Sequence, residues 1–376
     1  MPRPIQATIH LPALRHNLAR ARQAVPDARV WAVLKADAYG HGIDRVFDAV
    51  RAADGLAVLD LAEAQRLRAL GWRGPVLLLE GVFEPRDLEW CSRLDLWHVV
   101  HTEAQIDWLA QHKTHQGHHV YLKLNSGMNR LGFAPMAFRA AWARLQALNQ
   151  VDQLSLMTHF SDADGERGIA AQMQVYEAAT QGLPAAHCVA NSAAILRHVQ
   201  ARGLPADWVR LGIAMYGSAP DAPSHSAANW GLQPTMSLRS QLIAIQSLQP
   251  GDTVGYGSSF TAPQAMRVGI VACGYADGYP RHAGSAQGAP VLVRGVRTHT
   301  VGRISMDMLA VDLRPVDAAP AAAAQLGDEV VLWGCGRDGA CLPIDEVAHA
   351  AGTIAYELLC ALAPRVPVAV EDDGEV

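Results

Sequence analysis

Short apolar segments of the β type recur along the first part of this chain and alternate with stretches of helical character. Residues 62–70 and 136–145 show the helical period best, with apolar side chains three and four positions apart. The eight β-type segments lie near residues 30–34, 55–59, 75–79, 97–100, 119–124, 154–159, 186–190 and 207–211. Eight β-α units over roughly 200 residues predict a parallel (β/α)₈ barrel of the TIM type. A doubly wound open sheet is the alternative, because periodicity alone does not distinguish the two.

The character of the chain changes after Gly217. Residues 219–227 are rich in Pro, Ala and Ser, as a linker is. Beyond them, short β-type segments near 236–245, 268–272 and 291–293 are separated by Gly and Pro turns, and a helical segment begins at Ile344. We therefore expect two domains, a barrel over residues 1–228 and a mainly β domain over residues 229–376.

Composition narrows the classes of partner. The 376 residues are 50% apolar and 18% charged, and the net charge of -5 provides no basic surface for a nucleic acid. No stretch of about 18 apolar residues could span a bilayer, and the first residues lack the apolar segment of a secretory signal. We expect a cytoplasmic protein with neither a nucleic-acid nor a membrane partner.

The cysteines and a histidine-rich stretch are candidates for disulfide or metal sites. The six cysteines are scattered without a C-x-x-C pair, so we expect them to be reduced, small core residues. Four histidines crowd residues 111–119 without a carboxylate or cysteine beside them, which favours a solvated turn over a metal site. We therefore expect no bound metal.

Reactive side chains follow several of the β-type segments, where barrel enzymes place their chemistry. Lys35 follows the first segment, and burial at a strand end would lower the pKa of its amine and make it nucleophilic. Residues 123–132, 158–160, 190–192 and 209–217 follow the fifth to the eighth segments. A nucleophile, bases, cations and donors for a phosphate group are thus predicted to meet at one rim of the barrel.

The segment A-V-L-K-A-D-A-Y-G-H-G around Lys35 resembles the lysine segment of bacterial alanine racemases. Further strings resemble motifs of that family in the family's order and cover both expected domains: N-S-G-M-N-R-L-G, M-T-H-F, A-N-S-A-A-I-L, V-R-L-G-I-A-M-Y-G, G-Y-G-S-S-F, C-G-Y-A-D-G-Y-P-R, V-G-R-I-S-M-D-M and G-T-I-A-Y-E-L-L. Asn125-Ser126 and Leu211 depart from the commonest pattern, where Asp-Thr and Pro are frequent. Neither departure replaces a residue assigned to chemistry.

The resemblance implies an isomerase that interconverts L- and D-alanine with pyridoxal 5′-phosphate (PLP) and supplies D-alanine for peptidoglycan. Lys35 would hold PLP and act as one proton-transfer base, with Tyr256 as the other, because racemisation needs proton transfer on both faces of Cα. Arg210 at the pyridine nitrogen would disfavour its protonation and limit side reactions. The resemblance also implies a homodimer with shared active sites, in which Tyr256 and Met306 serve the partner's site.

The resemblance assigns the remaining site residues by group. The residues that hold PLP would be Lys35, Tyr39, His159, Asn191, Ser192, Arg210, Gly212, Ile213 and Tyr356. Arg130 and the Met306 backbone would bind the substrate carboxylate. Lys123, Asp307, Asp164 and Tyr275 would support the site or line its entrance. Carbamylation of Lys123 stays open, as does a biosynthetic or a catabolic role.

Three rival functions remain at this point. A racemase of broad specificity would share fold and cofactor but accept larger or basic amino acids. A related barrel decarboxylase is disfavoured, because its relatives resemble one another in using an acidic residue where Arg210 stands. A PLP-binding protein without turnover is disfavoured by the second domain that carries Tyr256.

Overall fold

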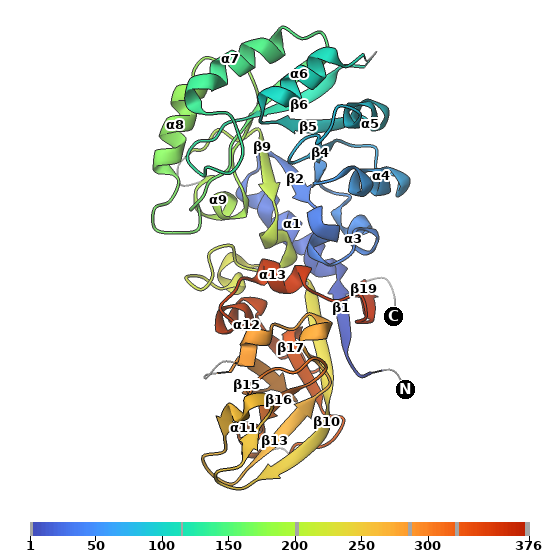
Figure 1. Ribbon diagram of the computed structural model, residues 1–376, viewed down its shortest axis with the longest axis vertical. Helices are drawn as coiled ribbons and strands as arrows, with labels where there is room; N and C mark the ends of the chain where they lie inside the picture. Colours follow the sequence, from blue (N-terminus) through green and yellow to red (C-terminus); the bar gives the residue numbers. More distant parts are fainter. Residues whose placement is uncertain (1–2, 114–115, 200–202, 285–287, 320–322, 373–376) are drawn as a thin grey trace. The chain divides into compact units, whose positions relative to one another are not determined.

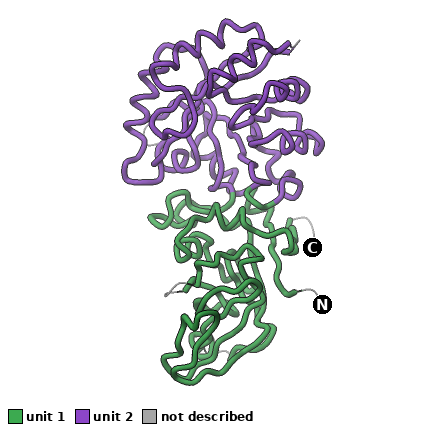
Figure 2. The backbone as a smooth tube through the Cα atoms, viewed as in Figure 1, with its two compact units in different colours: residues 1–14, 39–41, 216–376 green, residues 15–38, 42–215 purple. Residues whose placement is uncertain are grey.

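The computed structural model describes residues 3–113, 116–199, 203–284, 288–319 and 323–372. The chain forms two compact units, which Figure 2 shows in different colours. The barrel unit comprises residues 15–38 and 42–215, and the β unit comprises residues 1–14, 39–41 and 216–376.

Eight parallel strands of the barrel unit pair in the order β8-β7-β6-β5-β4-β3-β2-β9 (Figure 1). They are β2 (Arg29–Val33), β3 (Gly55–Val58), β4 (Val76–Leu78), β5 (Leu96–Val100), β6 (His118–Lys123), β7 (Val151–Met157), β8 (His187–Cys188) and β9 (Trp208–Leu211). The amide of Asp207 donates to His187 O over 3.0 Å and that of Arg210 to Ala190 O over 2.9 Å, which joins β9 to the β8 end. This confirms the predicted eight-stranded barrel and excludes the open sheet.

Helices follow most of these strands. They are α3 (Ile43–Val50), α4 (Leu61–Ala69), α5 (Asp87–Leu94), α6 (Glu103–Gln111), α7 (Pro135–Gln146), α8 (Ala170–Thr180) and α9 (Ser192–Arg197), with α1 (Leu11–Ala24) before β2 and the 3₁₀ turn η1 (Ile213–Tyr216) after β9. Local sequence explains their starts: Asp60 and Thr102 cap α4 and α6, because their side chains accept from the amides of Glu63 and Gln105.

Aromatic rings fill the inside of the barrel. The ring of Trp31 on β2 stacks on Trp208 of β9 at 4.2 Å and meets Trp97 of β5 edge-on at 5.3 Å. Trp31 also lies 6.3 Å from the ring of Tyr121 on β6. Because β2 pairs with neither β5 nor β6, these contacts cross the barrel and show which face of each strand points inward.

The β unit contains a nine-stranded sheet in the order β18-β17-β14-β15-β16-β13-β10-β1-β19, with a further β17–β10 pairing and a separate β11–β12 hairpin. Its strands are β1 (Gln6–His10), β10 (Met236–Leu248), β11 (Thr253–Val254), β12 (Phe260–Thr261), β13 (Met266–Val271), β14 (Pro290–Val293), β15 (Val296–Val301), β16 (Leu309–Asp312), β17 (Glu329–Cys335), β18 (Cys341–Leu342) and β19 (Val368–Glu371). Its helices are α11 (Arg314–Asp317), α12 (Ile344–Ala350) and α13 (Ala355–Cys360), and its 3₁₀ turns are η2 (Ala227–Trp230), η3 (Tyr256–Ser258), η4 (Tyr275–Asp277) and η5 (Arg281–Gly284).

The first residues of the chain belong to this sheet. The sequence placed residues 1–14 in the barrel domain, whereas β1 pairs antiparallel with β10 and parallel with β19. Ala7 and Ile9 of this strand are fully buried. The pairing of β1 with strands more than two hundred residues later leaves no signal in the local sequence. The domain boundary expected at residue 228 therefore did not assign β1 to the β unit.

Two expectations about cysteine and histidine were wrong. Cys335 and Cys341 form a disulfide, because they stand opposite each other in the β17–β18 hairpin, and Cys360 is exposed, whereas Cys91, Cys188 and Cys273 are buried free thiols. His118 is not in a solvated turn but buried at the start of β6, and His119 stacks on Trp97 at 3.6 Å. His115 lies outside the described residues.

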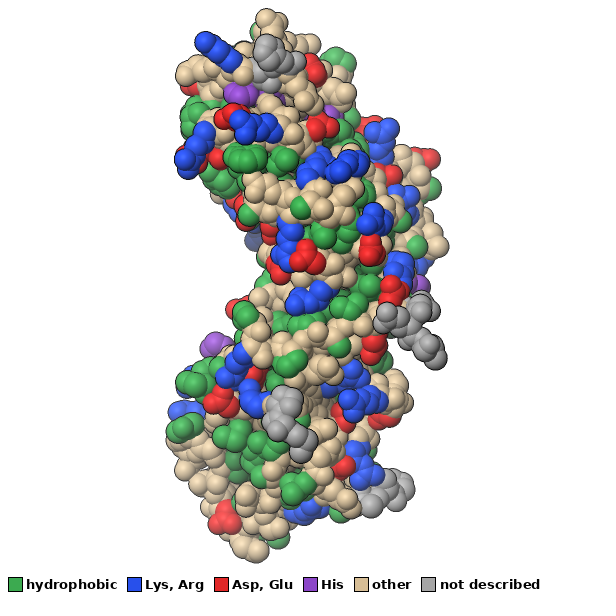
Figure 3. Space-filling model, turned by 90° about the vertical axis from the view of Figure 1, so that its right-hand side faces the viewer, with side chains coloured by type: hydrophobic (Ala, Val, Ile, Leu, Met, Phe, Trp, Pro, Cys, Tyr) green, Lys and Arg blue, Asp and Glu red, His purple; other side chains and the backbone are tan. Residues whose placement is uncertain are grey.

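The surface carries mixed charge. On the face that Figure 3 shows, Lys and Arg side chains lie interspersed with Asp and Glu. No helix within the described residues combines the length and the apolar character needed to cross a bilayer. Among the same residues, no group of three or more His, Cys, Asp or Glu side chains is placed to hold a metal ion.

Candidate active site

Side-chain alternation directs four polar residues to one rim of the barrel. Successive residues of a strand point to opposite faces, so residues two apart share a face. Tyr121 and Trp208 point inward, and two positions later stand Lys123 and Arg210, both buried. By the same count, Lys35 follows the β2 strand of Trp31, and His159 follows β7.

Lys35 begins a turn of unusual handedness. The segment α2 (Lys35–Tyr39) has φ of 55°, 50°, 56° and 52° at its last four residues, Ala36 to Tyr39. Such left-handed backbone costs about 1–2 kcal/mol for each residue with a Cβ atom. Strain of this kind is concentrated at functional sites and persists only where surrounding bonds hold it.

Asp37 is at the centre of the bonds that hold this turn. Its carboxylate accepts from the amide of Ile43 over 2.9 Å and from Arg66 Nη1 over 3.0 Å, while its own amide donates to Glu63 Oε1 over 3.1 Å. Asp37 O also accepts from the amide of Gly42 over 2.8 Å. These bonds come from α4 and the start of α3, so the barrel helices fix the backbone next to Lys35.

Arg210 is buried and surrounded by neutral acceptors. Its guanidinium donates to Cys188 O over 2.6 Å, Thr158 O over 2.9 Å and Val189 O over 3.2 Å, and to His159 Nδ1 over 3.1 Å. Among the described residues, no carboxylate lies within ion-pair distance of Arg210. The ordinary interpretation of a buried arginine, a structural ion pair, therefore does not apply here.

His159 is neutral in this environment. Burial, followed by the charges of Arg210, Lys123, Arg130 and Lys35, lowers the pKa of its imidazole to about 2. Because Arg210 only donates, His159 Nδ1 is an acceptor and the proton lies on Nε2. The pair thus combines the positive charge of Arg210 with a neutral imidazole whose Nε2–H can donate.

Lys123 and Arg130 share a small pocket with His159, which Leu124, Asn125, Met128 and Leu131 also line. Burial, together with the charges of Arg210 and Arg130, lowers the pKa of Lys123 to about 8. The loop that carries Arg130 is shaped by Asn125, whose side-chain oxygen accepts from the amides of Gly127 and Asn129 over 3.1 and 3.0 Å. Asn125 thus performs a loop-building role at a position where the sequence departs from the commonest family pattern.

Ser192 joins the loops after β8 and β9. Its Oγ accepts from the amide of Gly212 over 3.0 Å and from that of Ala214 over 3.4 Å. Asn191, not Ser192, caps α9, with its side chain accepting from the amide of Ala194 over 3.0 Å. Since both bonds of Ser192 use its oxygen as acceptor, the hydroxyl hydrogen stays available to donate beside Gly212 and Ile213, which suits an anionic group.

In the β unit, three tyrosines form one aromatic group. The buried ring of Tyr39 stacks on Tyr216 at 4.5 Å and lies 6.0 Å from the ring of Tyr356 on α13. His41 supports this group, because its Nδ1 lies 3.1 Å from Tyr39 O and its Nε2 2.8 Å from Thr235 Oγ1. Burial raises the pKa of Tyr39 strongly, so its hydroxyl stays protonated and can donate.

The remaining residues of the β unit lie near its surface. Tyr256 in η3 is 73% exposed, and Met306 is 53% exposed. The amides of Tyr275 and Ala276 donate to Ser305 O and Met306 O over 3.1 and 3.0 Å, which ties the Met306 loop to η4. An aromatic ring and a thioether so exposed are not core residues, contrary to the ordinary interpretation of either type.

Asp307 and Asp164 have different surroundings. Asp307 accepts from Arg365 Nη2 over 2.7 Å, and Arg365 also pairs with the buried Asp277. Asp164 is an exposed residue of the barrel unit, and its backbone oxygen accepts from Arg197. The structure thus brings Lys35, Lys123, Arg130, His159 and Arg210 within electrostatic reach of one another, whereas it places Tyr39, Tyr256, Tyr275, Met306, Asp307 and Tyr356 in the other unit.

Known proteins resemble this chain over its whole length. The alanine racemase N-terminal domain family matches residues 9–220, and the alanine racemase C-terminal domain family matches residues 235–370. An alanine racemase from Methylibium petroleiphilum is 70% identical over 374 residues, which cover 100% of both chains. One from Acidovorax sp. (strain JS42) is 68% identical over 372 residues, which cover 99% of this chain and 100% of the relative.

Solved structures agree with the sequence relatives. The biosynthetic alanine racemase of Pseudomonas aeruginosa superposes with a TM-score of 0.90 at 43% identity, covering 98% of this chain and 100% of the other. The alanine racemase of Acinetobacter baumannii gives a TM-score of 0.89 at 36% identity, with the same coverage. Both domain matches, the full-length relatives and the rim residues around Lys35 place this chain in the alanine racemase family.

Proposed function

We propose that this protein is an isomerase that interconverts L- and D-alanine with PLP and supplies D-alanine for peptidoglycan. The observation that carries the proposal is the buried Arg210–His159 pair at the same rim as Lys35. A cation without a carboxylate partner, beside a neutral imidazole, suits the pyridine nitrogen of a cofactor that is to stay unprotonated. Family membership and relatives named alanine racemase support the same reaction.

The donor set fits PLP. We assign the cofactor aldehyde to Lys35, the pyridine nitrogen to Arg210, and the ring surroundings to His159 and Asn191. Ser192, the amides of Gly212 and Ile213, and the hydroxyls of Tyr39 and Tyr356 are assigned to the phosphate. Once bound, PLP would withdraw electrons from the substrate and make the proton on Cα removable.

Two protein groups are assigned to the proton transfers. Lys35 would move the proton on one face of Cα and Tyr256 on the other, because inversion at carbon needs a base on each side. Arg130 and the Met306 amide would hold the substrate carboxylate, since a guanidinium fork matches a carboxylate. Asp164, Tyr275, Asp307 and Tyr356 are assigned to the entrance, which would restrict the site to small amino acids.

We further propose a homodimer with shared active sites. Tyr256, Tyr275, Met306, Met308 and Ile354 are exposed by 39–73% although their side chains are large and apolar or aromatic. Side chains of this kind are enriched at protein–protein interfaces. The dimer, and the service of Tyr256 and Met306 to the partner's site, rest on this exposure and on the family resemblance.

Lys123 suits a carbamate. A carbamate forms from CO₂ and an uncharged amine, and the pKa of about 8 leaves a larger share of Lys123 uncharged than an ordinary lysine has. The product is an anion, which three surrounding cations, Arg130, Arg210 and Lys35, would stabilise. We propose this modification for Lys123, and ¹³C-NMR of protein equilibrated with labelled bicarbonate would detect it.

We propose that the protein acts on a free amino acid in the cytoplasm, and the net charge of -5 with the mixed charge of Figure 3 argues against a nucleic-acid partner. The proposed activity is tested by reconstituting the purified chain with PLP, recording its absorbance and then measuring D-alanine formed from L-alanine. Bound PLP with D-alanine formation is the expected result. Bound PLP without turnover on alanine would favour a broad-specificity racemase or a non-catalytic PLP-binding protein instead, and a screen of larger and basic amino acids separates those two.

A further inference from the structure

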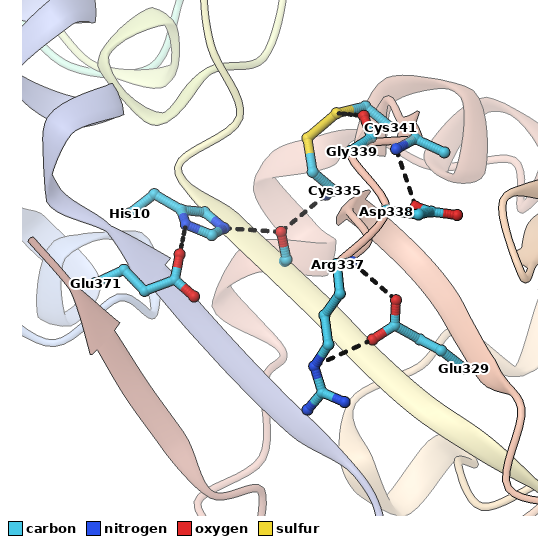
Figure 4. The surroundings of a disulfide bond; sticks show 10 residues. His10, Glu329, Cys335, Arg337, Asp338, Gly339, Cys341 and Glu371 are labelled. Carbon is cyan, nitrogen blue, oxygen red and sulfur yellow. Dashed lines mark hydrogen bonds and ion pairs between the residues drawn. A yellow bond between two sulfur atoms is a disulfide. The ribbon is translucent and has the colours of Figure 1, made fainter. Parts of the chain in front are cut away.

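The disulfide of the β unit joins the two strands of a short hairpin. β17 and β18 pair only at Gly334↔Leu342 and Cys335↔Cys341, and the disulfide closes the last of these pairs (Figure 4). The hairpin turn beyond it is closed by the amide of Gly336, which donates to Ala340 O over 2.8 Å. Neither cysteine belongs to the residues assigned to racemisation.

The backbone around Cys335 shows why the two sulfurs meet. The amide of Cys335 donates to Ser237 Oγ on β10 over 2.8 Å and not to the facing strand. Cys335 and Cys341 are therefore a non-hydrogen-bonded pair, the kind of antiparallel pair in which facing side chains lie closest. The register of the hairpin thus brings the two sulfurs together.

One end of the disulfide is anchored to the sheet. Gly334 lies so close to β10 that a Cβ atom there would stand 2.5 Å from Met236 O and from Ser237 Cα. Ser237 Oγ lies 2.8 Å from His10 Nε2, and His10 Nδ1 pairs with Glu371 Oε2 over 2.8 Å, so the anchor extends to β1 and β19 (Figure 4). Cys335 is thereby held on a rigid part of the unit.

The other end of the disulfide leads into a helix. Only Leu342 and Pro343 separate Cys341 from α12. The first turn of α12 has a second attachment, because Asp345 accepts from Ser218 Oγ and, over 3.1 Å, from the amide of Ala219. The disulfide thus links the sheet covalently to the start of α12 and to the α13 helix that follows.

Access distinguishes this pair from the three buried cysteines, and pairing distinguishes it from the exposed Cys360. Cys341 is exposed and Cys335 half-buried, whereas Cys91, Cys188 and Cys273 are fully buried. Cys341 also lines a cavity of about 160 Å³, whose walls include Ile344 of α12 and Leu359 of α13. A thiol reagent can reach Cys341, and the cavity gives the segment 341–344 room to move once the bond opens.

We propose that Cys335 and Cys341 form a reversible thiol–disulfide switch, which a low-molecular-weight disulfide such as glutathione disulfide oxidises and which fixes the start of α12 to the sheet. In the first step the Cys341 thiolate attacks one sulfur of glutathione disulfide, whose S–S bond breaks and releases one glutathione. The Cys335 thiolate then attacks the Cys341 sulfur of this mixed disulfide, forms the protein disulfide and releases the second glutathione. Two electrons pass from the protein dithiol to glutathione disulfide, and the two thiol protons end on the two released glutathione thiols.

The test equilibrates the full-length protein in mixtures of reduced and oxidised glutathione, followed by acid quenching and trypsin digestion. Trypsin cuts after Arg337 and next after Arg365, so the peptide with Cys335 and the peptide with Cys341 and Cys360 stay together only through a disulfide, and fragmentation of the linked pair assigns the bond to Cys341. The linked pair is expected to form in one two-electron transition. Hydrogen exchange of residues 341–360 is expected to be about tenfold slower or more in the oxidised form, because local opening limits exchange there.

Two variants serve as controls. Cys360→Ser removes the exposed cysteine outside the hairpin and should keep the transition. A double variant, Cys335→Ser with Cys341→Ser, should exchange at the reduced rate in both buffers. Glutathione bound at Cys341 without the linked peptide pair, no oxidation at any ratio, or equal exchange of residues 341–360 in both forms would each overturn the proposal.

Discussion

Arg210 Nη2 donates a hydrogen bond to Nδ1 of His159 over 3.1 Å. This bond settles the tautomer of the imidazole, with its proton on Nε2, and it joins a permanent cation to a residue that burial keeps neutral. The guanidinium also satisfies the carbonyl groups of Thr158, Cys188 and Val189 at the ends of β7 and β8. Arg210 therefore closes the barrel rim as well as serving the proposed pyridine site.

Replacing Arg210 by lysine should cost both stability and activity. A lysine ammonium has a single nitrogen, which cannot reach the Thr158 oxygen, the Cys188 oxygen and His159 Nδ1 at once. Some of these buried acceptors would therefore lose their donor. We expect the free energy of unfolding to fall by about 2–4 kcal/mol in Arg210→Lys, since each unsatisfied buried group costs about 1–3 kcal/mol. Urea unfolding measures this change, and alanine racemisation should fall about tenfold or more.

The matched control is Arg139→Lys, because Arg139 is exposed and donates to a single backbone oxygen, that of Gln181. Its unfolding free energy should change by less than about 0.5 kcal/mol. An equal loss of unfolding free energy in the two variants would show that the buried hydrogen bonds of Arg210 do not contribute to stability.

Ser192→Ala should weaken PLP binding without unfolding the barrel. The substitution removes the acceptor of the Gly212 and Ala214 amides and the hydroxyl donor assigned to the phosphate. We expect the apparent Kd for PLP to rise about tenfold, which corresponds to about 1.4 kcal/mol. Absorbance titration of the apoprotein with PLP measures it. Ser161→Ala is the control, since Ser161 donates to Gln172 in the same unit and is assigned no role, and an equal rise there would contradict the assignment of Ser192.

Removing the Tyr256 hydroxyl should reduce turnover and leave stability unchanged. The ring of Tyr256 is 73% exposed and contributes little to the stability of the folded monomer. The free energy of unfolding of Tyr256→Phe should therefore differ by less than about 0.5 kcal/mol from that of the parent chain. Loss of a general base typically lowers the reaction rate about 10²–10⁴-fold, and we expect the rate of racemisation to fall roughly 10²-fold or more in at least one direction. Lys35→Ala should lose both the cofactor absorbance and the activity. If Tyr256→Phe racemised alanine at the parent rate in both directions, the two-base assignment would be wrong.

Two buried histidines of the barrel unit, His98 and His118, make its stability depend on pH. His98 Nε2 lies 3.3 Å from His118 Nδ1, and the Nε2 atoms of His118 and His112 lie 3.3 and 3.2 Å from Ser92 Oγ, which itself donates to Leu88 O. These contacts are satisfied when His98 and His118 are neutral and each carries its proton on Nε2, with His112 also donating from Nε2 to Ser92 Oγ. A second proton on His118 would place two donors against each other.

Burial lowers the pKa of His118 to about 4 and that of His98 to about 3, below the usual 6.5. The unfolded chain therefore binds protons first, and stability present above pH 6.5 is lost as the pH falls toward 4. We expect the free energy of unfolding to fall by roughly 2–4 kcal/mol over this window. Urea unfolding at pH 7, 6, 5 and 4.5 measures the slope. The slope should become shallower in His118→Gln, although His98, His119 and His159 also contribute to it, and it should be unchanged in the control His349→Gln, which alters an exposed histidine of α12. An unchanged slope in His118→Gln would refute a contribution from His118.

Local pattern was enough to predict the eight strands, whereas their closure into a barrel rests on the bonds that join β9 to the β8 end. Each β-type segment is apolar over a few residues and each is followed by a turn, so all eight strands could be predicted from short windows of sequence. The rule that barrel chemistry lies after the strands then directed attention to Lys35, Lys123, His159 and Arg210, and the alternation of side chains explains why these four share a rim.

Other features depended on residues far apart in the chain. Ala36 and Ala38 disfavour positive φ, and bonds from α3 and α4 to Asp37 help to hold the turn in this conformation. The pairing of β1 with β10 and β19 likewise joins distant segments, and the surroundings of His118 come from Ser92 of α5 and from His112, which follows α6. The Cys335–Cys341 bond needed the register of β17 and β18. Sequence alone thus determined the strands, the family motifs and the chemical types at the rim, because these are local; the tertiary structure decided handedness, burial and pairing, because each is stabilised by contacts between residues that are distant in sequence.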